Sequence, residues 1–408
     1  MSLFGSLYTS VSGLSAQSQA LSMISDNIAN TSTIGYKSNS AQFSSMVMQT
    51  SAGSQYSSGS VQTNTIQNIN QQGLLQQTQS STDLAISGSG FFVVQPSSQS
   101  GAGAVYTRAG SFTENSLGYL VNTAGFYLMG WPLSTSGALP TATDTVQSLQ
   151  PVNLSNFATS LARTSSASFN LNLDATDAVP ASGNNFSRSL TVYDSLGGAQ
   201  NIDLAFTKTG TNAWTLTATG GSPLTTATQA LTFASDGSLA TPASGTVSLG
   251  PINWGNGSAT NQTIDIDIAN LTQQSAPYSV GSATQDGVPF GNRSGVSVDK
   301  DGNVIASYTN GQTRKIFQLP IATFAAPSQL SNASGNVYEQ TLASGPYYLN
   351  QAGSGGAGII APSSLEQSNV DLATEFSNMI VTQQAYAANS KVISTTNQML
   401  QQLMQIQV

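Results

Sequence analysis

The sequence predicts a mixed fold in which two long terminal α-helices pair in a coiled-coil-like manner, with two nested all-β domains inserted between them. Apolar residues recur every seven positions at both ends of the chain, and short alternating strands with Gly and Asn turns fill the middle. Residues 285–349 show the same pattern of short strands and turns as residues 73–144. Heptads are typical of paired helices, and alternation is typical of half-buried strands.

The C-terminal helix is predicted over residues 368–408, where neither Gly nor Pro interrupts the apolar stripe. About 40 residues at ~1.5 Å each span on the order of 60 Å, which is more than an ordinary globular core needs. The stripe therefore requires a partner. The residues of this stripe that we expect to form an assembly interface are Leu372, Phe376, Met379, Tyr386, Ile393 and Leu400.

The N-terminal helix is predicted to end near Ala29 and Asn30 and to supply that partner. Residues 1–25 carry eight serines and no charged side chain, so ion pairs between successive turns are missing. Each Ser costs about 0.5 kcal/mol of helix propensity relative to Ala, or roughly 4 kcal/mol in all. The expected interface residues are Leu7, Val11, Leu14, Leu21 and Ile28.

This weak helix propensity favours burial of the helices among copies of the same chain. We expect residues 1 to about 30 and about 366 to 408 to form one terminal helical domain that is disordered in the purified monomer. The alternative is a pair of terminal helices packed on an ordinary domain.

Composition excludes several classes of protein. Charged residues make up 7% of the chain, the net charge is −8, and Lys and Arg form no cluster, so nucleic acid and anionic membranes are poor partners. His and Cys are both absent, which removes the usual general base and thiolate chemistry. No run approaches the roughly 18 apolar residues of a membrane span. We expect no cofactor, no metal and no membrane insertion.

The N-terminus lacks the positively charged region and the unbroken apolar core of a Sec-type signal peptide. The low-charge, cysteine-free composition is nevertheless typical of exported surface proteins. We therefore expect export without a cleaved signal.

The first β domain is predicted at 73–144 plus 285–349, with Asn310 and Gly311 as a hairpin signal. Residues 145–284 are predicted to form a separate inserted domain, a β-sandwich or small barrel, because short strands alternate with Gly, Asn and Asp turns. Residues 31–72 plus 350–365 are polar and read as an extended connector, with a disordered linker as the alternative for the first part.

The motif NIANTSTIGYK at 27–37 resembles the N-terminal signature of the bacterial flagellar rod, hook and hook-associated axial proteins, with Asn30, Gly35 and Tyr36 as its landmarks. The blocks DLAISGSGFFVV and YTRAGSF resemble the same family, as does NASGNVYEQTLASG at 332–345. The segment TVYDSLGGAQNIDLAF at 191–206 is similar to the central block of its hook branch.

This resemblance implies a structural subunit of the flagellar hook, not an enzyme, that polymerises helically into a short curved tube. The tube acts as a universal joint that transmits torque from motor to filament. The implied partners are the distal rod protein below, the hook–filament junction protein above, the assembly cap and the export apparatus. The implied location is outside the cell, with the terminal helices on the inner wall of the tube and the β domains in the outer shells.

The distal rod is the main alternative, although in this family it lacks a large inserted central domain. Two further classes stay open. A surface adhesin requires a closed trimer of the terminal helices, and a secreted carbohydrate-active enzyme requires an acid pair in the β-sandwich.

Several motifs suggest chemistry but lack a required part. Asp299, Asp301 and Asn303 match the start of an EF-hand loop, yet Val304 and Asn310 stand where Gly and Glu are needed. A turn between strands is the preferred interpretation.

The remaining candidates are glycines and isolated charges. Gly353, Gly355 and Gly358 fit G-x-G-x-x-G but precede Ile-Ile-Ala-Pro and no helix, which favours a flexible joint. Asp265 and Asp267 share one strand face, which we interpret as solvated. Lys391 is the only base of the C-terminal helix. We expect it to be solvated or to face the lumen, with a buried ion pair to Glu375 or Asp371 of a neighbouring copy as the alternative.

Overall fold

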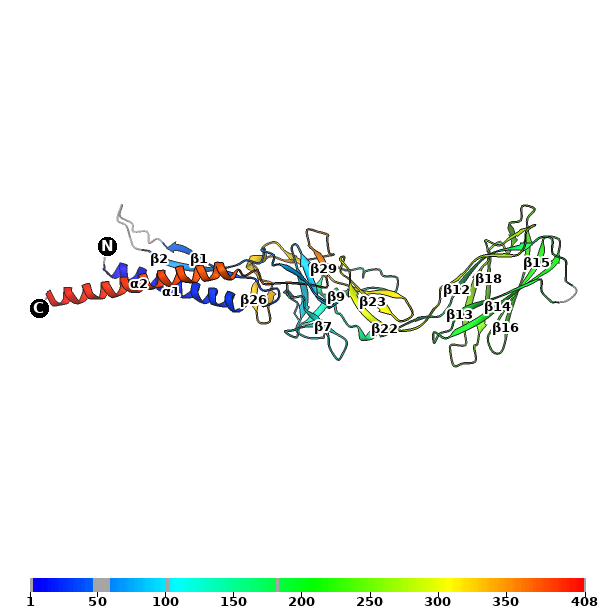
Figure 1. The fold of residues 1–408 in the computed structure, drawn as a ribbon, viewed down its shortest axis with the longest axis horizontal. Coiled ribbons are helices and arrows are strands. Elements are labelled where there is room, and N and C mark those ends of the chain that lie inside the picture. Colours follow the sequence, from blue (N-terminus) through cyan, green and yellow to red (C-terminus); the bar gives the residue numbers. More distant parts are fainter. Residues whose placement is uncertain (1–2, 47–58, 100–102, 181–182, 407–408) are drawn as a thin grey trace. The chain divides into compact units, whose positions relative to one another are not determined.

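The structure is a computed structural model that describes residues 3–46, 59–99, 103–180 and 183–406. It is mostly β, with a long α-helix near each end of the chain and several sheets between them, as the sequence predicts (Figure 1). The chain divides into two compact units. The first contains Met1–Asn156, Val296–Ala306 and Arg314–Val408, and the second contains Phe157–Gly295 and Ser307–Thr313.

Helix α1 (Leu3–Ala29) ends where the sequence predicts. The backbone N–H of Asn30 donates to the carbonyl of Asp26 at 3.1 Å, and the Asn30 side-chain amide donates to the same carbonyl at 2.9 Å. These bonds satisfy a carbonyl that the helix itself leaves without a partner at its C-terminus. Asn30 therefore terminates α1 through both its backbone and its side chain.

Helix α2 (Leu372–Ile406) begins four residues later than predicted. The reason is Asp371, whose Oδ1 accepts hydrogen bonds from the backbone N–H groups of Ala373 at 2.8 Å and Thr374 at 3.1 Å. An Asp in this position is a strong helix N-cap. Residues 368–371 are therefore extended chain that leads into the helix.

The two helices lie side by side and run antiparallel (Figure 1). Near one end Asn27 of α1 donates to Glu375 of α2, and near the other Gly13 lies against Asn389. The pairing of the terminal helices is thus present within a single chain.

Strands β1 (Asn39–Met46) and β2 (Ser60–Gln67) form an antiparallel hairpin that packs along α1. Thr9 donates to the carbonyl of Gly59 at 2.9 Å, and Ser12 exchanges hydrogen bonds with the backbone of Val61. These residues of the expected connector, which was predicted to have little core of its own, therefore form a backbone-paired hairpin. Backbone pairing stabilises the hairpin, although its side chains are mostly polar. Residues 47–58 of the same expected connector lie outside the described residues.

The other strands of the first unit form a larger sheet and two small ladders. Strand β9 pairs with β5, β10 and β24, β5 continues to β6 and β25, and β27 links β6 to β26. Strand β4 pairs with β29, and β3 pairs with β30. The bounds are β3 (Leu75–Gln77), β4 (Leu84–Ser87), β5 (Phe91–Gln95), β6 (Val105–Thr107), β7 (Phe112–Glu114), β8 (Leu120–Asn122), β9 (Tyr127–Pro132), β10 (Gln150–Pro151), β24 (Thr313–Gln318), β25 (Ile321–Phe324), β26 (Ser331–Ala333), β27 (Val337–Glu339), β28 (Tyr347–Asn350), β29 (Ile359–Pro362) and β30 (Ser364–Glu366).

An aromatic core fills this β region. Phe91, Tyr106, Trp131 and Phe324 are buried in it, and the rings of Tyr106 and Phe324 meet edge to face with centroids 4.7 Å apart. Edge-to-face contact is a favoured geometry for aromatic pairs. Between β23 (Asn303–Tyr308) and β24, Gly311 adopts φ +82° in the turn that the Asn310-Gly311 pair predicts.

The second unit is a β-sandwich, one of the two architectures predicted for the inserted region. Most of its described strands form two five-stranded sheets, one around β12 and β19 and one with the order β13-β14-β15-β16-β17, while β11 and β22 pair with each other in the larger sheet. The inner faces enclose Phe169, Phe206, Trp214 and Ile264. The bounds are β11 (Thr159–Ala162), β12 (Ser166–Asp174), β13 (Phe186–Tyr193), β14 (Ala199–Gly210), β15 (Ala213–Gly220), β16 (Thr225–Phe233), β17 (Leu239–Thr241), β18 (Thr246–Ile252), β19 (Gln262–Asp267), β20 (Thr272–Gln274), β21 (Ser279–Gln285) and β22 (Val288–Val298).

The unit boundaries differ in detail from the expected ranges. Strand β10 pairs with β9, so residues up to Asn156 belong to the first unit, and Ser307–Thr313 belong to the second. The finer division into four parts stays a prediction. Neither α1 nor α2 is long and apolar enough to cross a membrane.

Candidate functional site

The motif at residues 27–37 forms a tight loop between α1 and the β region of the first unit. Gly35 has φ +68°, and its N–H donates to the carbonyl of Glu366 at 2.8 Å. A Cβ at this position would lie 2.6 Å from the backbone of Arg108 and Ala109. Only glycine fits here, because both the backbone angle and the close approach exclude a side chain.

Asn27, the first residue of the motif, is buried and joins three segments. Its Nδ2 donates to the carbonyl of Asn39 at 2.8 Å and to Oε1 of Glu375 at 3.0 Å. Its Oδ1 accepts from the hydroxyl of Tyr36 at 3.2 Å and from the N–H of Asn39 at 2.9 Å. One amide therefore ties α1 to the base of the hairpin, the motif loop and α2.

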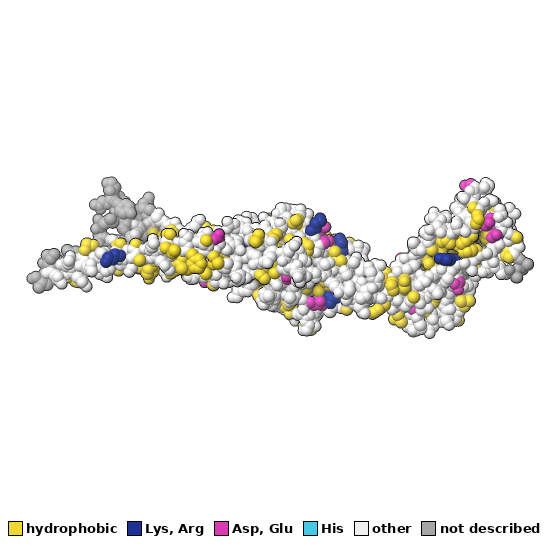
Figure 2. Space-filling view, viewed as in Figure 1, with side chains coloured by type: hydrophobic (Ala, Val, Ile, Leu, Met, Phe, Trp, Pro, Cys, Tyr) yellow, Lys and Arg dark blue, Asp and Glu magenta, His cyan; other side chains and the backbone are white. Residues whose placement is uncertain are grey.

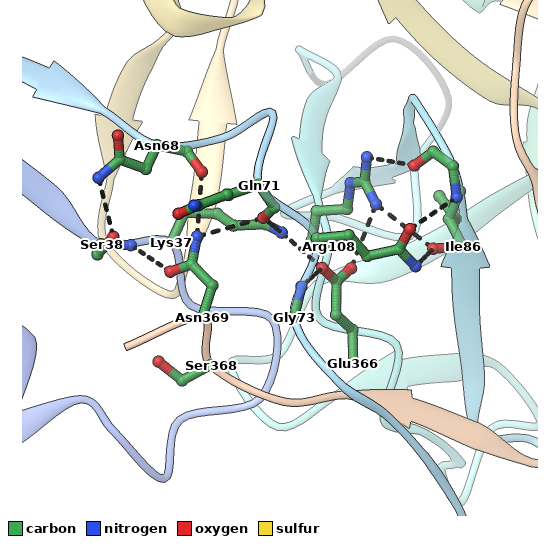
Figure 3. Close-up of polar contacts among 12 residues, drawn as sticks. Lys37, Ser38, Asn68, Gln71, Gly73, Ile86, Arg108, Glu366, Ser368 and Asn369 are labelled. Carbon is green, nitrogen blue, oxygen red and sulfur yellow. Dashed lines mark hydrogen bonds and ion pairs between the residues drawn. The ribbon is translucent and has the colours of Figure 1, made fainter. Parts of the chain in front are cut away.

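Lys37, Arg108 and Glu366 form a cluster of buried charges next to this loop (Figure 3). The Glu366 carboxylate is fully buried, and it accepts from Nζ of Lys37, from Nη1 of Arg108 at 3.2 Å and from the N–H of Gly73 at 2.8 Å. Arg108 also donates to the carbonyl of Gly88 at 2.8 Å. Residues from four distant parts of the sequence thus meet on one carboxylate.

The electrostatics of this cluster are governed by burial. Desolvation lowers the pKa of Lys37 and that of Arg108 below their usual values, and Glu366 opposes both changes. Two cations share one anion, so the cluster tolerates no loss of Glu366. A buried ion pair is costly to form but far more costly to leave half-complete.

Asn369 forms a second junction immediately before α2 (Figure 3). Its Oδ1 accepts from the N–H of Ser38 at 2.8 Å, and its Nδ2 donates to the carbonyls of Asn68 at 3.1 Å and Gln71 at 3.2 Å. Lys37 donates to the same carbonyl of Gln71 at 2.6 Å. The chain entering α2 is therefore fixed to both strands of the hairpin at its base.

The predicted interface residues occupy two different environments. The half-buried ones are Leu7, Leu14, Leu21, Ile28, Met379, Ile393 and Leu400, and the exposed ones are Val11, Leu372, Phe376 and Tyr386. Phe376 keeps 51% of its side-chain surface exposed. The large residues of the predicted stripe are therefore not the ones that this single chain buries.

Small and polar residues occupy the buried positions on the helices instead. Those on α1 are Ser10, Ala16, Ala20 and Asn27, and those on α2 are Thr382 and Thr396, while Ile24 is the one large apolar side chain buried on the described part of the helices. Gly13 lies beside Asn389, where an added Cβ would come within 3.0 Å of the amide. Small side chains allow the elements to approach closely but bury little apolar area.

A strip of large apolar side chains consequently remains exposed on α2. Figure 2 shows hydrophobic side chains gathered along the terminal helices. The strip consists of the exposed interface residues of α2, namely Leu372, Phe376 and Tyr386, together with Ile380, Val381, Val392, Met399 and Met404. Exposed apolar patches of this kind mark interaction surfaces.

The candidate EF-hand residues form a turn, as expected. The Asp299 carboxylate accepts from the N–H groups of Asp301 and Asn303 and from the Asn303 side chain, which occupies the oxygens that a calcium ion needs. In the part of the chain that the structure describes, no group of three His, Cys, Asp or Glu side chains is arranged to hold a metal ion.

The remaining chemical candidates are likewise structural. Asp265 is exposed on β19 and accepts from Ser248, and Asp267 accepts from the N–H of Ala269. The Gly353 loop is followed by β29 and not by a helix, and Gly353 donates to the carbonyl of Gly358. This loop is a hydrogen-bonded turn, and its interpretation as a flexible joint stays a prediction.

Five residues were not predicted from the sequence to be parts of one site: Asn27, Lys37, Arg108, Glu366 and Asn369. The available signal was the rarity of charged residues in this chain. Lys37, Arg108 and Glu366 are three of these few, and they are buried together. Nothing in the sequence indicates that residues so far apart meet.

Four family profiles match this chain. They are described as "Flagella basal body rod protein" at residues 7–37, "Flagellar hook protein FlgE/F/G D1 domain" at 85–176, "Flagellar basal body protein FlaE D2 domain" at 158–288 and "Flagellar basal body rod FlgEFG protein C-terminal" at 361–406. Both helices and both β regions are included. The chain is thus an axial protein of the bacterial flagellum.

Proteins that are similar over the whole length of this chain identify its family within this class. The flagellar hook protein FlgE of Brucella suis is 37% identical, with 100% of both chains covered, and that of Rhizobium meliloti is 39% identical with the same coverage. The FlgE of Salmonella typhimurium is 33% identical over 97% of this chain and 98% of its own. The chain belongs to the flagellar hook protein FlgE family.

A solved structure shows a similar fold. The crystal structure of the Helicobacter pylori flagellar hook protein FlgE2 matches with a TM-score of 0.53 at 14% identity, covering 72% of this chain and 100% of that one.

Proposed function

We propose that this hook subunit polymerises with copies of itself into a short curved helical tube, the universal joint that transmits torque from the rod to the filament. The exposed apolar strip on α2 is the observation that carries the proposal. Val381 is 63% exposed and Ile380 is 56% exposed in the single chain. Burying a large apolar side chain stabilises an interface by about 1.5–3 kcal/mol, so several such residues together provide a strong drive to associate.

In this proposal the terminal helices of neighbouring copies pack in a coiled-coil-like manner. The seam consists of the predicted interface residues on α1 and α2. Residues 1–30 plus 366–408 form the inner wall of the tube. Residues 73–144 plus 285–349 form the next shell, 145–284 the outermost one, and 31–72 plus 350–365 connect the wall to the shells.

The proposed partners are the distal rod protein below the hook, the junction protein above it, the assembly cap and the export apparatus. The subunit is placed outside the cell, and it performs no catalysis. Membership of the hook protein family supports these points. Full-length similarity to hook proteins favours the hook over the distal rod.

The role of the strip is tested by the double variant Phe376→Ser, Ile380→Ser. Both side chains are exposed, so the isolated chain should fold normally by circular dichroism, while sedimentable polymer and assembled hooks should be lost. The control is Leu224→Ser in the second unit, where an equally apolar side chain is 69% exposed and hooks should form as in the wild type. Normal polymerisation of the double variant would overturn the proposed role of the strip.

The place in the flagellum is tested by immunoelectron microscopy with antibody against residues 145–284. Label is expected on a short curved segment between cell body and filament. Label on a straight shaft, seen only after the envelope is stripped, would move the protein to the rod.

A further inference from the structure

The charges of the helix pair are few and segregated. Helix α1 contains one charged residue, Asp26, and α2 contains Glu375 and Lys391, with Asp371 as its cap. The antiparallel arrangement brings the three carboxylates to one end of the pair, where Asn27 bonds Glu375. Lys391 lies sixteen residues further along α2, or about 24 Å at ~1.5 Å per residue.

Lys391 points away from its own helix partner. At 3.6 residues per turn, sixteen residues correspond to roughly 160° around the helix axis, so Lys391 and Glu375 project from nearly opposite sides of α2. Lys391 is exposed, and it takes part in no ion pair within the described residues. Figure 2 shows basic side-chain atoms on the terminal helices, next to hydrophobic ones.

Glu375 lines a cavity of about 230 Å³ enclosed by α1, α2 and β1. The walls include Ala20, Met23, Ile24 and Phe43, which are apolar. The carboxylate receives one hydrogen bond, from Asn27, and no cation among the described residues. Burial raises its pKa, because a charged carboxylate is poorly solvated there.

We propose that Lys391 of one copy enters this cavity on a neighbouring copy and pairs with Glu375. A lysine suits the space, because its methylene stem packs on apolar walls while the ammonium reaches a charged partner. Asp26 and Asp371 at the same end of the pair add to the attraction.

This contact rests on the proposed polymerisation and specifies its geometry. Because Lys391 and Glu375 are on different faces of the same chain, the contact is heterologous. Each copy contacts one neighbour through Lys391 and the opposite neighbour through Glu375. Copies in the same orientation are then displaced by about 24 Å along the helix axis. In a seam that is otherwise apolar, the ion pair fixes the register, a use for which isolated polar contacts are well suited.

The first test is charge reversal in the full-length chain, measured as the critical concentration for sedimentable polymer. Lys391→Glu should raise it roughly tenfold or more, because two carboxylates then meet. Adding Glu375→Lys should return it to within about threefold of the wild type, since the opposite charges are restored. Lys300→Glu, at an exposed lysine of the first unit, is the control and should leave assembly unchanged.

The second test leaves Glu375 and its bond to Asn27 intact. The chain has no cysteine, so introduced thiols are the only ones present. Chains with Lys391→Cys, mixed with chains carrying Asn378→Cys at the cavity wall, should form a disulfide-linked dimer on oxidation of the polymer. Replacing the first variant by Asn397→Cys should abolish the crosslink.

The outcomes separate the two proposals. If the wild type and the cysteine variants polymerise but neither charge reversal nor crosslinking has an effect, the Lys391 contact is wrong and the hook function stands. If the wild-type chain forms no polymer under any condition, the proposed function itself fails.

Discussion

Lys37 and Glu366, which lie 329 positions apart in the chain, form a buried ion pair that joins the end of the N-terminal motif to the last strand before α2. Arg108 completes the cluster from the β region. The helix pair is therefore anchored to the rest of the first unit by charges, whereas large apolar side chains lie exposed along its outer surface. The buried charges that anchor the helix pair and the exposed apolar strip on α2 are separate sets of residues, so substitutions can test them separately.

Glu366→Gln should lower the stability of the first unit by about 3–5 kcal/mol, because Lys37 and Arg108 are then buried without their anion. The measurement is the free energy of opening of β5 by amide hydrogen exchange. Lys300→Gln is the matched control, since its ion pair with Asp301 is exposed and its loss should cost at most about 1 kcal/mol. Equal effects of the two substitutions would contradict the anchoring role.

Gly35→Ala should destabilise the first unit by more than the left-handed backbone angle alone explains. The angle costs an alanine about 1–2 kcal/mol, and the Cβ also collides with the backbone of Ala109. Gly125→Ala isolates the first effect, because Gly125 has φ +86° and no atom lies near its Cβ position. Thermal unfolding of both variants should show the larger loss for Gly35→Ala. A loss of stability no greater than that of Gly125→Ala would show that the loop backbone shifts to accommodate the added Cβ, and would contradict the expected collision.

The fraction of chains in which the helix pair is formed should fall as the pH rises from acidic to neutral. Burial raises the pKa of Glu375 above its usual 4.5, so the folded chain binds this proton more tightly than the unfolded chain. Stability is then highest below pH 4.5 and falls as the pH rises through the raised pKa. Helicity at 222 nm should follow this course in the wild type, and Glu375→Gln should remove the contribution of this group. Identical pH profiles of the two chains would exclude this origin.

The terminal segments of the monomer should be open to protease. Helix α1 has weak intrinsic propensity, and the helix pair buries mainly small and polar residues. Digestion with a non-specific protease should therefore trim the chain from both ends. It should stop near residue 30 and near Asn369, because the hydrogen bonds of Asn369 hold the chain there. Slow exchange and resistance throughout α1 and α2 would contradict helix formation coupled to assembly.

The architecture was predictable because it rests on local periodicity. Heptads indicated both helices, Asn30 marked the end of α1, and alternation indicated the β-sandwich. The start of α2 was misplaced by four residues because Asp371 was not recognised as the residue that caps the helix. The hairpin of β1 and β2 was missed because a strand whose side chains are mostly polar shows no alternation.

The site was less predictable. The sequence locates Gly35 and Tyr36, but not the contacts that make them necessary. Which stripe of α1 faces inward was also not evident, because Ala16 and Ala20 are buried while the larger Val11 is exposed. Periodicity identifies apolar faces, and it does not distinguish a face covered within the chain from one covered by another copy.

The meeting of Lys37, Arg108 and Glu366 also determines the order in which the protein can fold during synthesis. Translation proceeds from the N-terminus, so Lys37 and Arg108 are made long before Glu366 exists. The first unit must wait for Glu366 before its charges are matched. The β-sandwich of Phe157–Gly295 has nearly all of its strands much earlier. A nascent chain can therefore fold its β-sandwich while the first unit is still incomplete, and a subunit becomes competent for assembly only after Glu366 has been made.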